Sequence, residues 1–385
     1  MPKSPARVCA VIAEQTIEAA QSAISRAGGF ADLIELRLDY LRDFDFTKTD
    51  GLAHLLAGKP KPVIITCRAF EEGGQQHVDH AVRLRLLVEG AKRFADYCDI
   101  EAAHYSDAVS LSPDLSRLIV SWHNFEETPA DLDKTYERIT ALPAGVHKIV
   151  TRANSINDSL AVFRLLDRAI SDGKKLIALA MGASGVVTRV LGPRRGSFLT
   201  YGALDPGKES AAGQLTCDEL INLYRVRRLT SDTAITGIIG APVAHSASPA
   251  MHNRAFAALG LDFVYLPFEV ENVETFFKRF IRSLTREIDW RVRGLSVTIP
   301  HKKAVVPLLD QLDAAAAEAG AVNTVVFDEG RLIGYNTDVQ GAMEPIERVL
   351  KLEGESCAVI GAGGAAAAVV YGLIKRGARV SVFVR

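Results

Sequence analysis

Eight short runs of β-forming residues recur through the first 205 residues, and their spacing restricts the fold more than any other feature. The runs begin at Val8, Leu33, Pro62, Tyr97, Leu118, Val146, Lys175 and Ser197. Most intervals between them hold helix-like segments, such as residues 16–29 and 156–173. Eight strands that alternate with helices over about 220 residues predict a closed (β/α)8 barrel, the TIM barrel. An open, doubly wound parallel sheet is the alternative.

Polar residues fall late in several of these runs. In LIELRLD, strict alternation places Glu35 and Arg37 on one face of the strand and Leu36 and Leu38 on the other. Further polar residues late in the following four runs are Arg68, Glu101, His123 and Lys148. Inward residues at the carboxyl ends of barrel strands line the active site of this fold. One polar face alone would also suit an exposed edge strand, but a series of them predicts a site at the barrel mouth.

The composition limits the partners of the protein. Forty-five basic and 46 acidic residues leave a net charge of −1, so no basic surplus indicates nucleic acid or a membrane surface. The five cysteines form no C-x-x-C pair, which predicts reduced thiols and a cytoplasmic location. The uncharged run 357–374 contains three early glycines and precedes a strand-like VSVFV. We therefore interpret it as strand, turn and helix rather than as a membrane span.

Lys148 gives the sharpest indication of chemistry. The run VHKIVTR places it on the inward face with Val146 and Val150, where an amine in apolar surroundings can act as a nucleophile toward a ketone. A lysine that reaches solvent, or that pairs with Glu101, is the alternative. His123 on the neighbouring strand could serve as general base or acid.

Other residues could complete this site. Glu72 follows the third strand and could orient the His123 imidazole, while Arg68 and Arg189 could hold a carboxylate.

Motifs throughout residues 6–225 resemble those of type I 3-dehydroquinate dehydratase. They are ELRLD, TCR followed by EEGG, SWHNF, HKIVT, and MGASGVVTRVLGPRRGSFLTYGAL followed by SAAGQ, in the order of that family. The resemblance implies that Lys148 forms a Schiff base with the C3 ketone of the substrate. It implies that His123 removes a C2 proton and helps to expel the C1 hydroxyl, while Glu72 positions His123. The residues it implies for substrate binding are Glu35, Arg37, Arg68, Arg189, Ser210 and Gln214.

A second domain is expected after the polar stretch 230–233. In GAPVAHSASPAMHNRAFAALG, a strand and a turn lead into a helix that Ser248 and Pro249 would open as N-cap and first residue. Ser246 and Ser248 would then lie at a helix N-terminus, which favours anions, although simple capping is the alternative for Ser248.

A glycine-rich turn follows the next predicted strand. The residues Gly361, Ala362, Gly363, Gly364, Ala365 and Ala366 match G-x-G-x-x-A between a strand and a helix. Such glycines let a pyrophosphate approach the backbone at a helix N-terminus. This segment predicts a dinucleotide-binding unit.

Motifs from about residue 235 onward resemble those of shikimate dehydrogenase. They are H-S-x-S-P, V-T-I-P-H-K, A-V-N-T, N-T-D and G-A-G-G-A-A. The resemblance implies that Lys302 and Asp338 move a proton while NADPH reduces the ketone of 3-dehydroshikimate. The residues it implies for substrate binding are Ser246, Ser248, Thr298, Asn323 and Asp338. Ser296 is a departure, because many relatives carry Asn there.

The expected organisation is a dehydratase barrel at 1–229, a substrate-binding domain at 234–345 and a partial NADP-binding Rossmann unit at 354–385. Because the first product is the second substrate, we expect a bifunctional enzyme of the shikimate pathway, which serves aromatic amino acid biosynthesis. Its expected partners are 3-dehydroquinate, 3-dehydroshikimate and shikimate, with NADP favoured over NAD by Arg385. The sequence stops after the second strand of the dinucleotide-binding unit, so we expect either a fragment of a longer protein or the absence of the second activity. In both cases we expect little NADPH-dependent reduction by this chain.

Three alternative interpretations fit the sequence less well. An aldolase-like Schiff-base barrel is disfavoured by the ordered Arg, Ser and Gln set. A non-catalytic regulator that responds to quinate or shikimate is disfavoured because Lys148 and His123 are present. His77 and His80 in HVDH could indicate a metal, but we expect none, because no third ligand accompanies them, and we interpret HVDH as a helix start.

Overall fold

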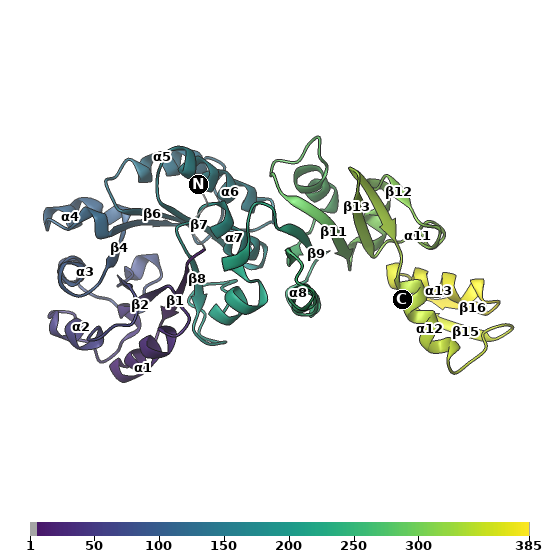
Figure 1. The fold of residues 1–385 in the computed structure, drawn as a ribbon, viewed down its shortest axis with the longest axis horizontal. Coiled ribbons are helices and arrows are strands. Elements are labelled where there is room, and N and C mark those ends of the chain that lie inside the picture. Colours follow the sequence, from purple (N-terminus) through teal and green to yellow (C-terminus); the bar gives the residue numbers. More distant parts are fainter. Residues whose placement is uncertain (1–5, 385) are drawn as a thin grey trace. The chain divides into compact units, whose positions relative to one another are not determined.

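The computed structural model describes residues 6–384. It divides the chain into two compact units, Met1–Ser231 and Asp232–Arg385 (Figure 1). The predicted NADP-selecting residue, Arg385, lies outside the described residues. The proposed division of the second unit into segments 234–345 and 354–385 stays a prediction.

The first unit is a parallel barrel. Its strands are β1 (Val8–Ile12), β2 (Leu33–Arg37), β3 (Val63–Thr66), β4 (Tyr97–Glu101), β5 (Leu118–His123), β6 (Val146–Arg152), β7 (Leu176–Met181) and β8 (Thr200–Ala203). Their spatial order is β7-β6-β5-β4-β3-β2-β1-β8, so neighbours in sequence are neighbours in space and β8 pairs with β1. A doubly wound sheet would reverse its order in the middle. The predicted barrel is therefore confirmed.

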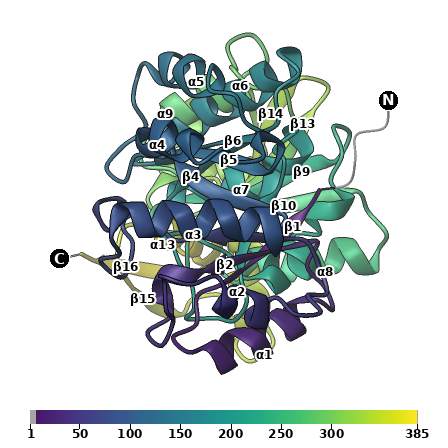
Figure 2. The same ribbon diagram turned by 90° about the vertical axis from the view of Figure 1, so that its left-hand side faces the viewer.

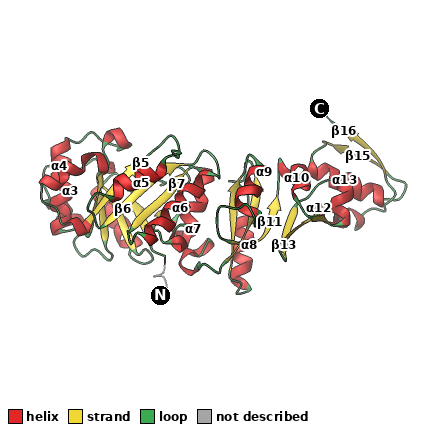
Figure 3. Ribbon diagram, turned by 90° about the horizontal axis from the view of Figure 1, so that it is seen from above, coloured by secondary structure: helices red, strands yellow, loops and turns green. Residues whose placement is uncertain are grey.

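The barrel is nearly closed. Within residues 6–384, β7 and β8 share no ladder, but the Phe198 N–H, just before β8, donates to Leu176 O at 2.8 Å. Helices surround the strands (Figures 2 and 3). They are α1 (Ile17–Ala27), α2 (Asp50–Leu55), α3 (His80–Arg93), α4 (Tyr105–Ser110), α5 (Leu132–Thr140), α6 (Asp158–Ser171) and α7 (Val186–Leu191).

Alternation along the strands separates an apolar layer from a polar one. In β2, Leu33 belongs to a buried apolar cluster that includes Val11, Ile64 and Ile177. Glu35 and Arg37 follow on the same face, nearer the carboxyl end of the strand. The apolar layer fills the barrel, and the polar layer lies above it at the mouth.

The second unit contains a mixed sheet with strand order β10-β9-β11-β13-β14-β12. The strands are β9 (Ala234–Gly240), β10 (Phe263–Glu269), β11 (Arg291–Val297), β12 (Gln311–Leu312), β13 (Thr324–Asp328) and β14 (Arg331–Tyr335). Strand β13 runs antiparallel to both of its neighbours. The accompanying helices are α8 (Ser248–Ala258), α9 (Val273–Phe276), α10 (His301–Ala304), α11 (Ala314–Ala319) and α12 (Asp338–Glu347).

The run 357–374 forms the predicted strand, turn and helix. Strand β15 (Ser356–Ile360) leads through the glycine turn into α13 (Gly364–Lys375), and β16 (Arg379–Phe383) pairs parallel to β15. None of the described helices combines the length and the apolar character that crossing a membrane requires.

The predicted cap of α8 is wrong by one residue. Ala247 is the N-cap, and Ser248 is the first helical residue, with Pro249 after it. The Ser246 hydroxyl accepts a hydrogen bond from the Ser248 N–H at 3.2 Å. A serine before the cap therefore satisfies one of the unpaired N–H groups of the first turn.

Candidate active site

A pocket opens at the carboxyl ends of the barrel strands. Its lining includes every residue of the first unit that the sequence assigned to catalysis or substrate binding: Glu35, Arg37, Arg68, Glu72, His123, Lys148, Arg189, Ser210 and Gln214. These residues come from β2, β5 and β6 and from segments that follow β3, β7 and β8. The barrel thus brings together side chains that lie far apart in the sequence.

The Lys148 amine lies inside this pocket, and its residue is 6% exposed. Its Nζ is 2.9 Å from Asp99 Oδ2 and 3.7 Å from Glu35 Oε1. It also lies 4.7 Å from the ring centroid of Tyr201. The expected alternative partner, Glu101, instead binds Arg68 and Arg83. The lysine therefore does not reach solvent, and carboxylates as well as apolar groups surround its amine.

His123 and Glu72 face one another across the pocket. His123 Nδ1 lies 3.4 Å from Glu72 Oε2, and neither atom has a hydrogen-bond partner among the described residues. Burial, with the positive charges of Arg68 and Lys148, holds the pKa of His123 well below its usual value. Burial raises the pKa of Glu72 to about 7, against the opposing effect of Arg68. The imidazole is therefore neutral near pH 7 and can accept a proton.

Arg68 is held by an ionic network beneath the pocket. Its guanidinium binds Asp99 Oδ1 at 2.9 Å, Glu101 Oε1 at 3.1 Å and Ser121 Oγ at 3.0 Å. Despite its burial, Asp99 has a pKa well below its usual range, because Arg68 and Lys148 stabilise its charge. Sequence analysis missed Asp99 and Ser121. The signal for Asp99 was present, since in YCDIE it shares a strand face with Glu101.

Two polar residues of β2 have partners nearby. The Thr66 hydroxyl donates to Glu35 Oε1 at 2.9 Å. Arg37 donates to both oxygens of Asp39, at 2.9 and 2.7 Å. These bonds fix the directions in which the Glu35 and Arg37 side chains meet the pocket.

Arg189 differs from Arg68 in its surroundings. Its residue is 2% exposed, its Nε has no hydrogen-bond partner, and Nη2 donates only to Ala212 O at 3.4 Å among the described residues. Burial lowers the pKa of Arg189 to about 10. Ser210 and Gln214 lie in the same pocket, where Gln214 Oε1 accepts from the Ser210 N–H at 2.7 Å. A buried guanidinium with no carboxylate partner is suited to an anionic ligand.

The second unit joins Lys302 and Asp338. Lys302 Nζ, on α10, donates to Asp338 Oδ2, at the start of α12. Asn323 Nδ2 donates to the other Asp338 oxygen at 2.8 Å. Ser246 bonds the Ser248 N–H, and the Thr298 N–H donates to Ile239 O at 2.9 Å. Of the predicted substrate residues, Asn323 is therefore the one that binds the pair directly.

The turn after β15 suits a pyrophosphate. Gly361 has φ +109°, and a Cβ added there or at Gly363 would meet no atom within 4 Å, so the backbone is open to approach. The first helical residue, Gly364, packs against the Lys302 side chain, since a Cβ there would lie 2.5 Å from Lys302 Cβ. Ala365 and Ala366 lie in the first turn of α13. This turn fits the pyrophosphate of a dinucleotide and adjoins the Lys302 segment.

Comparison with known families gives two matches. Residues 8–231 match the type I 3-dehydroquinase family, and residues 238–325 match the shikimate dehydrogenase substrate binding domain. The chain is 36% identical to the chloroplastic bifunctional 3-dehydroquinate dehydratase/shikimate dehydrogenase of Arabidopsis thaliana, over 99% of its own length and 65% of that protein's. It is 31% identical to the shikimate biosynthesis protein AroDE of Chlamydia pneumoniae, over 98% of its own length and 76% of that protein's.

A solved structure supports the barrel. The 3-dehydroquinate dehydratase of Geobacillus kaustophilus aligns with a TM-score of 0.50 and 24% identity, over 58% of this chain and 91% of that one. The family match covers the whole barrel, and the AroDE match continues through the second unit. The chain belongs to the type I 3-dehydroquinase family, in the group whose members join this barrel to a shikimate dehydrogenase.

Proposed function

We propose that the barrel dehydrates 3-dehydroquinate to 3-dehydroshikimate through an imine on Lys148. One observation carries the proposal: a single pocket holds a buried primary amine, a neutral imidazole and a buried guanidinium that has no carboxylate partner in the described part of the chain. The amine could react with a ketone of the substrate, the imidazole could remove a proton, and the guanidinium could bind a carboxylate. The names of the bifunctional relatives state the same activity for those proteins.

The proposed chemistry uses Lys148 as an electron sink. Its Nζ attacks the C3 carbonyl, and loss of water gives an iminium. His123 then removes a C2 proton, and the electron pair left at C2 is delocalised into the iminium. His123 returns its proton to the C1 hydroxyl, which leaves as water, and hydrolysis of the imine releases the product. Glu72, 3.4 Å from Nδ1, holds the ring in place and stabilises the transient imidazolium.

The hydrogen-bond partners of Arg68 and Arg189 indicate which of them would bind the substrate carboxylate. The donors of Arg68 are engaged by Asp99, Glu101 and Ser121, whereas Arg189 has no carboxylate or hydroxyl partner within residues 6–384. We therefore assign the substrate carboxylate to Arg189, with Ser210 and Gln214 beside it, and give Arg68 a role in positioning Asp99. Glu35 and Arg37 would bind substrate hydroxyls.

We further propose that the second unit reduces 3-dehydroshikimate to shikimate with NADPH, and that this reduction is slow, because β15 and β16 form a sheet of two strands among the described residues. When bound, the nicotinamide supplies a hydride, and the turn Gly361–Ala366 would hold the pyrophosphate of the cofactor. Lys302 and Asp338 would deliver the proton to the ketone oxygen of the substrate, and Asn323 would orient Asp338. Ser246, Ser248 and Thr298 would bind substrate hydroxyl and carboxylate groups. Relatives of this unit named shikimate dehydrogenase (NADP(+)) support the choice of cofactor.

One assay tests both halves. The chain is incubated with 3-dehydroquinate, with and without NADPH, and both products are followed. Formation of 3-dehydroshikimate without NADPH supports the barrel assignment, and its absence contradicts it. Formation of shikimate only in the presence of NADPH supports the assignment of the second unit. With 3-dehydroshikimate as the supplied substrate, Lys302→Ala should abolish this product. The alternatives of a non-catalytic regulator and of an aldolase predict neither product.

A further inference from the structure

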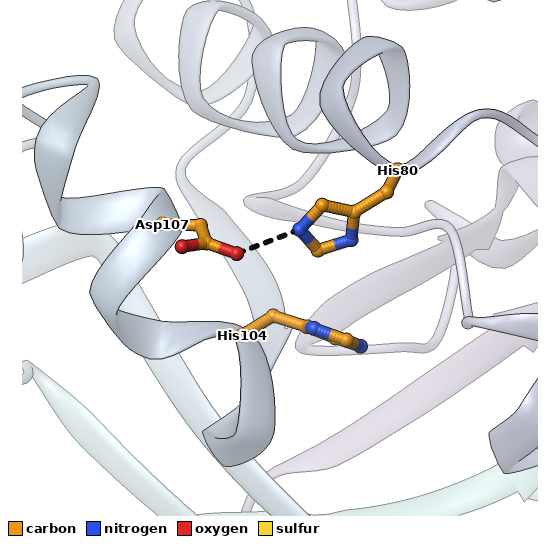
Figure 4. Close-up of side chains that lie close together, drawn as sticks. All are labelled: His80, His104 and Asp107. Atoms are coloured by element: carbon orange, nitrogen blue, oxygen red, sulfur yellow. Dashed lines mark hydrogen bonds and ion pairs between the residues drawn. The ribbon is translucent and has the colours of Figure 1, made fainter.

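Three potential metal ligands meet outside the pocket of the barrel. They are His80, the first residue of α3, His104, the last residue of the 3-10 helix Ala102–His104, and Asp107 of α4. One ligand atom from each lies within 4.8 Å of the others. Figure 4 shows the His80 ring directed at the Asp107 carboxylate, with the His104 ring beside them.

The contacts within this cluster engage His80 and Asp107 but not the ring nitrogens of His104. His80 Nε2 lies 2.9 Å from Asp107 Oδ2, and the His80 and His104 rings have centroids 4.5 Å apart. The His104 ring makes no hydrogen bond to any residue in the described range 6–384. A simple ion pair between His80 and Asp107 would not need a second imidazole with free ring nitrogens at this distance.

The charged groups next to the cluster are paired with one another. The other charged groups that act on His104 are Arg83 and Glu101. Arg83 Nη1 lies 2.8 Å from Glu101 Oε2 in the interior, so the Glu101 carboxylate compensates the positive charge of Arg83 beside the cluster. His80 and Asp107 are exposed and His104 is half-buried, so a metal can enter from solvent.

We propose that His80, His104 and Asp107 bind one divalent transition-metal ion, with Zn²⁺ the best match. Two imidazoles and one carboxylate suit zinc and its neighbours, whereas Mg²⁺ and Ca²⁺ prefer sets made only of oxygen. Zinc sites with three protein ligands keep water in the fourth position, as the exposure here allows. Ligand distances of about 2.0–2.2 Å place the ligand atoms of a tetrahedral site about 3.4 Å apart, within reach of rotamer changes from the observed spacing.

The ion would join two segments at the barrel mouth. His80 ends the segment that carries Glu72 from β3 into α3, whereas His104 and Asp107 belong to the segment after β4. One turn beyond His80, Arg83 reaches Glu101, which also binds Arg68 in the pocket lining. Metal binding would therefore hold the far end of the Glu72 segment in place.

The test is zinc binding by the untagged full chain after chelator treatment, measured by titration calorimetry. We expect one Zn²⁺ per chain, and at least a tenfold loss of affinity in each of His80→Ala, His104→Ala and Asp107→Ala, because even second-layer changes cost about 10–100-fold. His54→Ala is the matched control, since it removes an exposed histidine of α2 and should leave affinity unchanged. Circular dichroism is the check that each variant is folded.

A second readout is independent of calorimetry. Zinc at about 100 times its dissociation constant should raise the melting temperature of the barrel by roughly 5 °C, and should slow hydrogen exchange in residues 70–80. Both effects should vanish in His104→Ala. The proposal is overturned if the wild-type chain binds no Zn²⁺, or if His80→Ala and His104→Ala bind it as tightly as the wild type, because the ion would then lie elsewhere.

Discussion

The Nζ of Lys148 lies 2.9 Å from Asp99 Oδ2, although their strands, β6 and β4, are separated by β5 in the barrel. The same carboxylate binds Arg68 through its other oxygen at 2.9 Å. Asp99 therefore compensates two buried cations, Lys148 on β6 and Arg68 just after β3. This contact links the stability of the barrel to the placement of the Lys148 amine.

Asp99→Asn should lower the free energy of unfolding of the barrel by about 3–5 kcal/mol, because it leaves buried positive charge without its partner. Urea denaturation in a Trp290→Phe background measures the barrel alone, since Trp122 is then the remaining tryptophan. Asp133→Asn, which removes a carboxylate 3.7 Å from Arg168 on the surface, should cost less than about 1 kcal/mol. Equal losses in the two variants would contradict the role given to Asp99.

Borohydride added with 3-dehydroquinate should trap an adduct on Lys148 and inactivate the dehydratase. The reason is that reduction converts the iminium into a stable secondary amine. Mass spectrometry of peptides locates the adduct. Lys148→Ala should give no adduct. The control is Lys175→Ala, which removes an exposed lysine just before β7 and should be labelled like the wild type. An adduct on another lysine would exclude the proposed mechanism.

Dehydratase turnover should fall as the pH drops through about 7, the pKa to which burial raises Glu72. Above that pH the Glu72 carboxylate is ionised and can stabilise the His123 imidazolium, and below it the protonated acid cannot. The low pKa of His123 keeps the ring neutral through this range, so its own titration lies at lower pH. Glu72→Gln should remove the step near pH 7 and lower turnover at pH 8. A step that survives in this variant would belong to another group.

Arg189→Gln should raise KM for 3-dehydroquinate by about 10–100-fold with a smaller effect on kcat, because a charge-assisted bond to the carboxylate contributes about 1.5–3 kcal/mol. Steady-state kinetics separates the two parameters. The control is Arg138→Gln, which removes an exposed arginine of α5. An unchanged KM would show that another group, such as Arg68, binds the carboxylate.

Local pattern was sufficient for much of the fold. Period-two alternation identified the strands, and in β2 it placed Glu35 and Arg37 on the inward face and Leu36 on the outward one. The spacing of strands and helices predicted the barrel, because parallel strands need helical connections of that length. Both properties depend on short stretches of chain, so the sequence contains them directly. Motif order then indicated the residues of both units.

The pairing of charged side chains in the barrel could be identified only from the tertiary structure. The sequence suggested Glu101 as a partner of Lys148, but the barrel places Asp99 there and gives Glu101 to Arg68 and Arg83. Which side chains meet inside a barrel depends on strand register and on depth along the axis, and neither can be computed from spacing within one strand.

The cluster of His80, His104 and Asp107 also depends on tertiary structure. HVDH showed no third ligand, because His104 and Asp107 come from a different βα segment. The sequence by itself determined the strands, their inward faces and the residue types that reach the mouth. Tertiary structure decided which charges pair, which arginine stays available and which ligands converge, because those distances are set by packing between segments far apart in the chain.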